Sequence, residues 1–236
     1  VVRCPAAAQR GAAASRLAGH HQLGMTRAVF LQGRVPHRYI PALSISLFLS
    51  ANEEDVKQAM LAGYPAGQVL ESRHIDEEDD QELRVAFDFD GVVADDESET
   101  IYQETHDVAK FHEYEQSHVN VPHTPGPLKD FLAKLSIVQQ LEEEKATEDA
   151  KYKPKLRISI VTARNAPSHE RVINTMRNWG ITVNEAFFLG GIEKKKVLEV
   201  LNPHIFFDDQ KTHLVPTSSV LPSVHIPFGI TNTTSP

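Results

Sequence analysis

Apolar residues follow two different spacings through the second half of this chain. Short continuous apolar runs, which are typical of buried strands, alternate with longer segments whose apolar residues recur at helical spacing. Strands that alternate with helices predict a parallel sheet with helices on both faces, which is an α/β fold. The predicted strands are 83–88, 156–161, 186–189, 205–207 and 224–226, and the predicted helices are 167–179 and 193–201.

Residues 26–72 show the same alternation in a shorter form, which predicts strand, helix, strand, helix and strand. The second of these helices begins at Asn52, whose side chain is a favourable N-cap, and runs to Gly63. Residues 1–25 show neither spacing. No helix or strand is predicted there, so the segment stays unassigned, and disorder is one interpretation of it.

A long insertion, residues 97–150, separates the first two strands of the second half. Its polar start has apolar residues at helical spacing, and a second amphipathic helix begins near Pro127. The charge-rich stretch 142–155 predicts a solvated loop. The insertion as a whole predicts a small helical cap.

Residues 26–52 resemble residues 184–210 without a gap. The scaffold of apolar residues and glycine is shared, but the two adjacent aspartates of the later copy are Ser50 and Ala51 in the earlier one. A duplication whose first copy has lost its charged groups explains this pattern, and chance similarity of two strand–helix–strand units is the alternative. The predicted domains are therefore a partial degenerate repeat over 26–80 and a catalytic domain over 81–236 that contains the insertion 97–150.

The composition of the chain indicates which cellular compartment and which kinds of binding partner to expect. The single cysteine, Cys4, excludes an internal disulfide and favours a reducing compartment, so a cytoplasmic location is expected. A net charge of -8 without basic clusters argues against a nucleic-acid partner. The longest apolar stretch, 40–51, is interrupted by Pro41 and is too short to span a bilayer, so no membrane partner is expected.

The start of the chain carries arginines but no acidic residue before Glu53. An organellar presequence has this kind of composition. We favour the alternative that the sequence starts inside a longer protein, because residue 1 is valine.

Two carboxylates one residue apart, Asp88 and Asp90, follow a short apolar run and precede Gly91. Alternate residues of a strand face the same side of a sheet, so the two acids would repel each other and lose hydration. That arrangement is costly unless a cation or a reaction uses it. It predicts a metal-assisted site with an aspartate nucleophile.

Further polar residues follow the other predicted strands. Thr162 ends the second strand, Lys194 follows the third, and Asp208 and Asp209 end the fourth. Ligands of such sheets bind at the carboxyl ends of the strands, so these residues are expected to meet the first pair of aspartates there. Lys195 is the alternative to Lys194, because three lysines stand in a row.

The order DxDGV, hydrophobic-T, K and DD resembles that of the haloacid dehalogenase superfamily of phosphotransferases, and it implies a Rossmann-like sheet. Within this superfamily the chain is similar to the cytosolic type I 5′-nucleotidases over about residues 26–230. Members of that family resemble a tandem pair with a degenerate first repeat. Only the back half of that repeat is present here, so the chain resembles an N-terminally truncated member. The segments that carry the resemblance are 85–88, 95–99, 125–129, 161–164 and 204–210.

The expected reaction is phosphate-ester hydrolysis through an aspartyl-phosphate. Asp88 would attack phosphorus, and Asp90 would protonate the leaving oxygen and later activate water. Thr162 and Lys194 would bind the phosphate oxygens, and it is the resemblance that favours Lys194 over Lys195. A Mg²⁺ ion prefers oxygen ligands, and the expected ligands are Asp88, the backbone carbonyl of Asp90, Asp208 and Asp209.

The resemblance implies nucleoside 5′-monophosphates such as AMP or IMP as substrates. Arg164, Phe111, His118 and Asn120 are the candidate substrate contacts, while His213 and His225 are interpreted as structural. Two alternatives stay open: a phosphatase of the same superfamily with another small phosphate ester as its substrate, and a non-catalytic truncated interaction module. Base preference, regulation and oligomeric state, a homo-oligomer included, also stay open.

Overall fold

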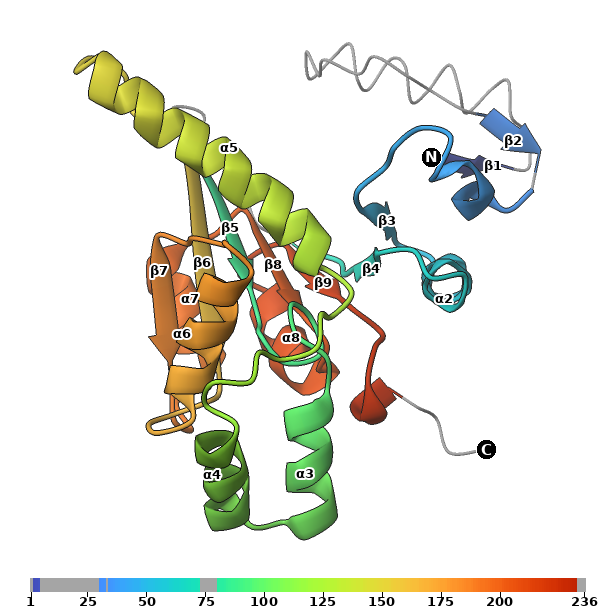
Figure 1. Cartoon of the computed structure of the whole chain (residues 1–236). Coiled ribbons are helices and arrows are strands. Elements are labelled where there is room, and N and C mark those ends of the chain that lie inside the picture. Colours follow the sequence, from blue (N-terminus) through green and yellow to red (C-terminus); the bar gives the residue numbers. More distant parts are fainter. Residues whose placement is uncertain (1, 5–29, 33, 73–79, 233–236) are drawn as a thin grey trace.

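A sheet of seven strands forms the centre of the structure and has helices on both faces (Figure 1). This computed structural model describes residues 2–4, 30–32, 34–72 and 80–232. The strands of the sheet are β3 (Phe48–Ser50), β4 (Ala66–Val69), β5 (Leu83–Phe87), β6 (Leu156–Thr162), β7 (Glu185–Phe188), β8 (Ile205–Asp208) and β9 (Ser223–His225). They are arranged in the order β3-β4-β9-β8-β5-β6-β7.

The helices differ widely in length. None of those in the described ranges has the length and apolar character that a membrane-spanning helix needs. The α-helices are α2 (Glu53–Leu61), α3 (Glu97–Thr105), α4 (Val108–Ser117), α5 (Lys129–Glu148), α6 (His169–Asn178), α7 (Lys194–Leu201) and α8 (Lys211–Ser218). The 3₁₀ helices are η1 (Pro36–Tyr39) and η2 (Ile230–Asn232), and a separate parallel pair consists of β1 (Val2–Cys4) and β2 (Phe30–Gln32).

Strands β9, β8, β5, β6 and β7 are parallel neighbours, which confirms the predicted α/β fold. β5 lies inside this group, with Phe87 opposite Phe207 of β8 on one side and Ile160 of β6 on the other. The whole sheet is mixed, however, because β4 runs antiparallel to β9, with Gln68 opposite His225. Local patterns cannot reveal this reversal, since it depends on how the early segment meets the rest of the chain.

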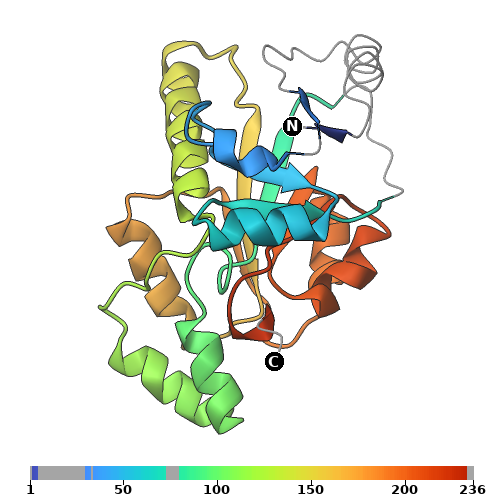
Figure 2. The same ribbon diagram turned by 90° about the vertical axis from the view of Figure 1, so that its right-hand side faces the viewer.

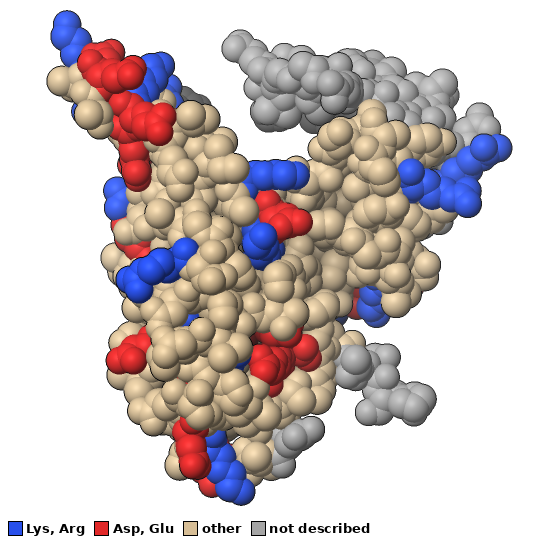
Figure 3. Space-filling model, in the orientation of Figure 1, with Lys and Arg blue, Asp and Glu red and all other residues tan. Residues whose placement is uncertain are grey.

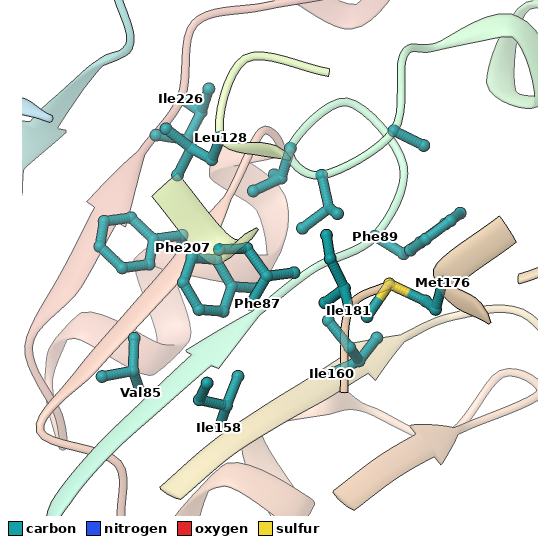
Figure 4. Close-up of a cluster of buried hydrophobic side chains, with 14 of the residues drawn as sticks. Val85, Phe87, Phe89, Leu128, Ile158, Ile160, Met176, Ile181, Phe207 and Ile226 are labelled. Atoms are coloured by element: carbon teal, nitrogen blue, oxygen red, sulfur yellow. The ribbon is translucent and has the colours of Figure 1, made fainter. Parts of the chain in front are cut away.

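The pleat of the sheet sorts the buried apolar side chains into two clusters. Phe87 faces the side covered by α5 and α6, where its ring stacks on Phe207 and the cluster includes Met176 (Figure 4). Ala86 faces the opposite side, where its cluster includes Leu198 of α7. Each fully buried large apolar side chain contributes about 1.5–3 kcal/mol, so these two layers fix the positions of the strand ends.

The helices α3 and α4 project from one end of the sheet (Figure 1, Figure 2). We call residues 95–124 the cap segment. Its two connections to the sheet lie side by side, because Ala94 forms an isolated antiparallel bridge with Pro125, and the amide of Asp95 donates to the carbonyl of Thr124 at 2.9 Å. A Cβ atom at Gly126 would collide with the carbonyl of Ala94, so glycine permits this close approach.

Two helices differ from the sequence predictions. α5 continues to Glu148 through part of the stretch predicted as a loop, because glutamate, lysine and alanine are strong helix formers even where no core covers them. Its outer end carries charged side chains of both signs (Figure 3). Sequence patterns do not predict α8, since Pro216 stands inside it and its apolar residues share no single face.

The early segment has the predicted order of strand, helix, strand, helix and strand, namely β2, η1, β3, α2 and β4. Asn52 caps α2 as predicted, since its side chain accepts a hydrogen bond from the amide of Glu54 at 3.0 Å. The same order recurs as β7, α7, β8, α8 and β9. β1 lies in the segment 1–25, for which no element is predicted, and most of that segment lies outside the described residues.

Candidate active site

Three buried charged side chains meet where β5 and β8 end. Asp88 directly follows β5, Asp208 ends β8, and Lys194 is the first residue of α7. The Nζ atom of Lys194 lies 2.6 Å from Oδ2 of Asp88 and 2.7 Å from Oδ2 of Asp208. The pleat explains the meeting, because Asp88 continues the face of Ala86 that α7 covers. The structure thus brings together three residues that the sequence predicted for one site.

Asp209 packs against the loop that follows β5. Its Oδ2 accepts a hydrogen bond from Oγ1 of Thr231 at 3.0 Å, whereas its buried Oδ1 has no hydrogen-bond partner among the described residues. Gly91 has a φ of +70°, and a Cβ atom there would lie 2.7 Å from Cγ of Asp209. A glycine at this position therefore supplies both the left-handed backbone and the room for the carboxylate.

The electrostatics of this cluster are dominated by burial and by excess negative charge. Burial raises the pKa of Asp88 to about 7, although the positive charge of Lys194 acts to lower it. Burial and the charges of Asp88 and Asp208 raise the pKa of Asp209 to about 9. Burial also acts to raise the pKa of Asp208, but Lys194 and His213 together hold it below its usual range. One lysine does not neutralise three carboxylates, so the cluster is electrostatically suited to a cation.

The side chains of Asp88 and Asp90 have different partners: Asp88 contacts Lys194, whereas Asp90 contacts Arg164. The alternation argument fails for Asp90, because β5 ends at Phe87 and the chain then turns, with the amide of Val93 donating to the carbonyl of Phe89 at 2.9 Å. Asp90 instead accepts two hydrogen bonds from Arg164, one from Nε at 2.7 Å and one from Nη2 at 2.6 Å.

A cavity of about 440 Å³ lies between the strand ends and the cap segment. Asp88, Asp90 and Thr162 contribute to its core side, and Arg164 lines it as well. From the cap segment come mainly apolar and aromatic side chains. The cap residues that line the cavity are Glu99, Tyr102, Val108, Phe111 and His112.

The predicted substrate contacts divide into two groups. Phe111 and Arg164 line the cavity. His118 and Asn120 are not among its lining residues: the ring of His118 stacks on Tyr114 at a centroid distance of 4.2 Å, and Asn120 is exposed in the turn after α4. Both lie beyond the end of the helix that carries Phe111, which sequence spacing alone did not reveal.

Sequence reasoning missed several lining residues, of which His213 is the most informative. It lies in α8 and was interpreted as structural, yet it lines the cavity with its Nδ1 3.2 Å from Oδ2 of Asp208. A ligand atom of His213 also lies within 4.8 Å of those of Asp88 and Asp208. Its spacing of one helical turn after the adjacent aspartates was the available signal.

Comparisons with known proteins bear on this geometry. A family model described as 5'-nucleotidase matches residues 2–233. This chain belongs to the 5'-nucleotidase family. The family consists of phosphoric monoester hydrolases.

One relative within the 5'-nucleotidases is cytosolic 5'-nucleotidase 1B of Homo sapiens, which is 34% identical over 208 residues. The match covers 88% of this chain but 33% of that protein, so the chain spans about a third of the length of this curated relative. No solved structure matches the chain significantly.

Proposed function

We propose that this chain hydrolyses nucleoside 5′-monophosphates, such as AMP or IMP, in the cytosol. The observation that carries the proposal is the buried cluster of Asp88, Lys194 and Asp208 beside a cavity of about 440 Å³. This volume lies within the range of small-molecule sites, roughly 300–1,000 Å³. Membership of the 5'-nucleotidase family supports the reaction class, and the name of the cytosolic relative supports the compartment.

In the proposed reaction, an Oδ atom of Asp88 attacks phosphorus while the bond from phosphorus to the 5′-oxygen of ribose breaks. Asp90 gives a proton to the leaving oxygen, so that a nucleoside and an aspartyl-phosphate form. Water then attacks phosphorus as Asp90 takes its proton, which releases inorganic phosphate and restores Asp88. Thr162 and Lys194 would hold the phosphate oxygens.

A divalent cation fits the residues present. The buried Oδ1 of Asp209, which has no partner within the described part of the chain, and the excess of carboxylates over Lys194 both favour an added positive charge. Oxygen donors are those that Mg²⁺ prefers. The side chains of Asp88, Asp208 and Asp209 and the backbone carbonyl of Asp90 would hold the ion. When bound, it neutralises charge on the phosphate oxygens.

Removal of the metal is expected to make stability fall as the pH rises. The pKa of Asp209 is raised to about 9, so the metal-free folded chain keeps a proton that the unfolded chain loses near pH 4. In EDTA the contribution of Asp209 to stability, and with it the Tm, should therefore drop as the pH rises from about 4 to about 9. Mg²⁺ should reverse the drop, and Asp209→Asn should flatten it in EDTA. Equal pH dependence in EDTA for the parent and Asp209→Asn would contradict this assignment.

The cap side of the cavity favours a nucleoside over a bare sugar. Tyr102, Val108 and Phe111 offer apolar and aromatic surface, which suits a base better than a hydroxyl-rich ring. His112 and Asn165 add a polar edge, with Nε2 of His112 2.8 Å from Oδ1 of Asn165.

The test is a substrate panel of AMP, IMP, ribose 5-phosphate and glucose 6-phosphate, with phosphate release measured in Mg²⁺ and in EDTA. Nucleotides should be hydrolysed fastest and only with metal. Phe111→Ala should raise KM for AMP by about tenfold and leave KM for the sugar phosphates unchanged, because stacking on a base is worth about 1–3 kcal/mol. If sugar phosphates are hydrolysed faster than nucleotides, the proposed substrate class is wrong and sugar phosphates take its place. No release from any ester, together with no stabilisation by Mg²⁺, would indicate a non-catalytic module.

We also propose that the fold is of the haloacid dehalogenase type, with α3 and α4 as its small cap, and that residues 26–80 are a partial degenerate repeat of the catalytic domain, residues 81–236. The recurring order of elements supports the duplication. α5 packs on the sheet, which supports placing it in the core of that domain although it lies within the insertion 97–150.

A further inference from the structure

A glutamate of the cap segment lies buried against the core. Glu115 of α4 is 1% exposed. Its Oε1 accepts hydrogen bonds from Oγ of Ser98 at 2.8 Å and from Nη1 of Arg171 at 2.9 Å, and its Oε2 pairs with Nη1 of Arg164. Nε2 of His123 lies 3.5 Å from the same Oε2. A charged residue at such depth is retained only with partners, and here two are arginines.

Arg164 connects this glutamate to the proposed acid–base residue. Its Nε and Nη2 hold both carboxylate oxygens of Asp90, while Nη1 is directed to Glu115. Phe89 and Phe111 lie beside the guanidinium, with their ring centroids 5.6 Å and 5.4 Å from Cζ. Because the guanidinium is planar and rigid, its orientation determines the positions of both carboxylates together.

This arrangement has a consequence for proton transfer. Both oxygens of Asp90 accept N–H groups from Arg164, so the carboxylate cannot turn toward a leaving oxygen while both bonds are kept. Asp90 has to release at least one of these bonds before it can act. Glu115 is the carboxylate that can retain the guanidinium when that happens, since it already accepts from the opposite edge of the same group.

We propose that Glu115 is a positioning residue that, through Arg164, determines when Asp90 is free to transfer a proton. The proposal rests on the function proposed above. Glu115 belongs to the cap segment, whereas Arg164 and Asp90 belong to loops at the strand ends. A shift of α4 on a bound substrate therefore changes how Arg164 is shared between the two carboxylates. This couples substrate binding by the cap to acid–base chemistry at the core.

The test compares two leaving groups. Glu115→Gln keeps the shape of the side chain but removes its charge, so Arg164 stays with Asp90. First-turnover release of adenosine from AMP, which needs a proton, should slow by about 10- to 100-fold, since general acid catalysis is worth about 10²- to 10⁴-fold. First-turnover release of nitrophenolate from p-nitrophenyl phosphate, which needs no proton, should change by less than about threefold.

Two further variants separate positioning from structure. Ser98→Ala removes a neutral hydrogen bond to Glu115 without altering its charge, and it should leave both first-turnover rates near those of the parent. Glu115→Asp keeps the charge on a shorter side chain and should restore part of the adenosine rate. If Glu115→Gln does not fold, the same comparison is made with Glu115→Asp, which should slow adenosine release more than nitrophenolate release.

Equal slowing of the two releases, or slowing of neither, would overturn the role of Glu115 while leaving the nucleotidase proposal intact. The parent chain is the check on that proposal. If it releases no adenosine from AMP at all, the proposed function fails and the inference fails with it.

Discussion

Asp88→Asn is expected to abolish phosphate release from AMP, with a loss on the order of 10⁴-fold or more, as when other covalent nucleophiles are removed. The amide keeps the size of the side chain but cannot form an acyl-phosphate of the same kind. Steady-state rates with Mg²⁺ measure the loss. Acid quenching with labelled AMP, followed by peptide mapping, should find label on the peptide that contains residue 88 in the parent and none in the variant.

The matched control lies at the other end of the same strand. Asp80→Asn removes a carboxylate that pairs with Arg84 before β5 begins, and it should leave the rate near that of the parent. If Asp88→Asn retains a rate within about tenfold of the parent, the assignment of the nucleophile is wrong, because uncatalysed hydrolysis is far slower.

Lys194→Met is expected to have the largest effect on stability. It leaves Asp88 and Asp208 buried without the cation that now lies within 2.7 Å of both. Loss of one partner of a buried pair is worth about 3–5 kcal/mol, so urea unfolding in EDTA should show a deficit of that size. Mg²⁺ should restore part of it by supplying positive charge. Activity should fall by about 10²- to 10³-fold, because a charge stabilising the phosphoryl group is lost.

Lys195→Met is the control for this variant, since Lys195 forms a helical-surface pair with Glu199 at 3.7 Å. Its effect should stay below about 0.5 kcal/mol. Similar losses in the two variants would indicate that Lys194 has no special role. An undiminished stability of Lys194→Met in EDTA would show that the buried carboxylates do not depend on it.

The positions of the strand ends could be predicted from the sequence because they depend on local patterns. Apolar runs ending in polar residues mark β5, β6 and β8, and parallel strands bring their carboxyl ends to one edge. This pattern predicts the positions of Asp88, Thr162 and Asp208. Only the family resemblance singles out Lys194 among three consecutive lysines, and its Nζ lies between Asp88 and Asp208.

The remaining features depend on contacts between distant segments. The pairing of Asp90 with Arg164 joins residues far apart in sequence, after a turn that alternation does not describe. Burial of Glu115 gives no signal in a polar helix, because its partners come from α3 and α6 and from the loop after β6. The antiparallel pairing of β4 with β9 likewise depends on how distant segments assemble into one sheet.

The paired connections of the cap segment at Ala94 and Pro125 have an evolutionary consequence. The residues that we propose to react belong to strand ends outside residues 95–124, whereas much of the cavity lining that would meet the rest of the substrate lies within them. New substrate preferences can therefore arise when the cap segment is exchanged as one unit, without changes to the strand ends. If Glu115 acts as proposed, such a replacement keeps its coupling to the chemistry only when it again presents an acidic side chain to Arg164.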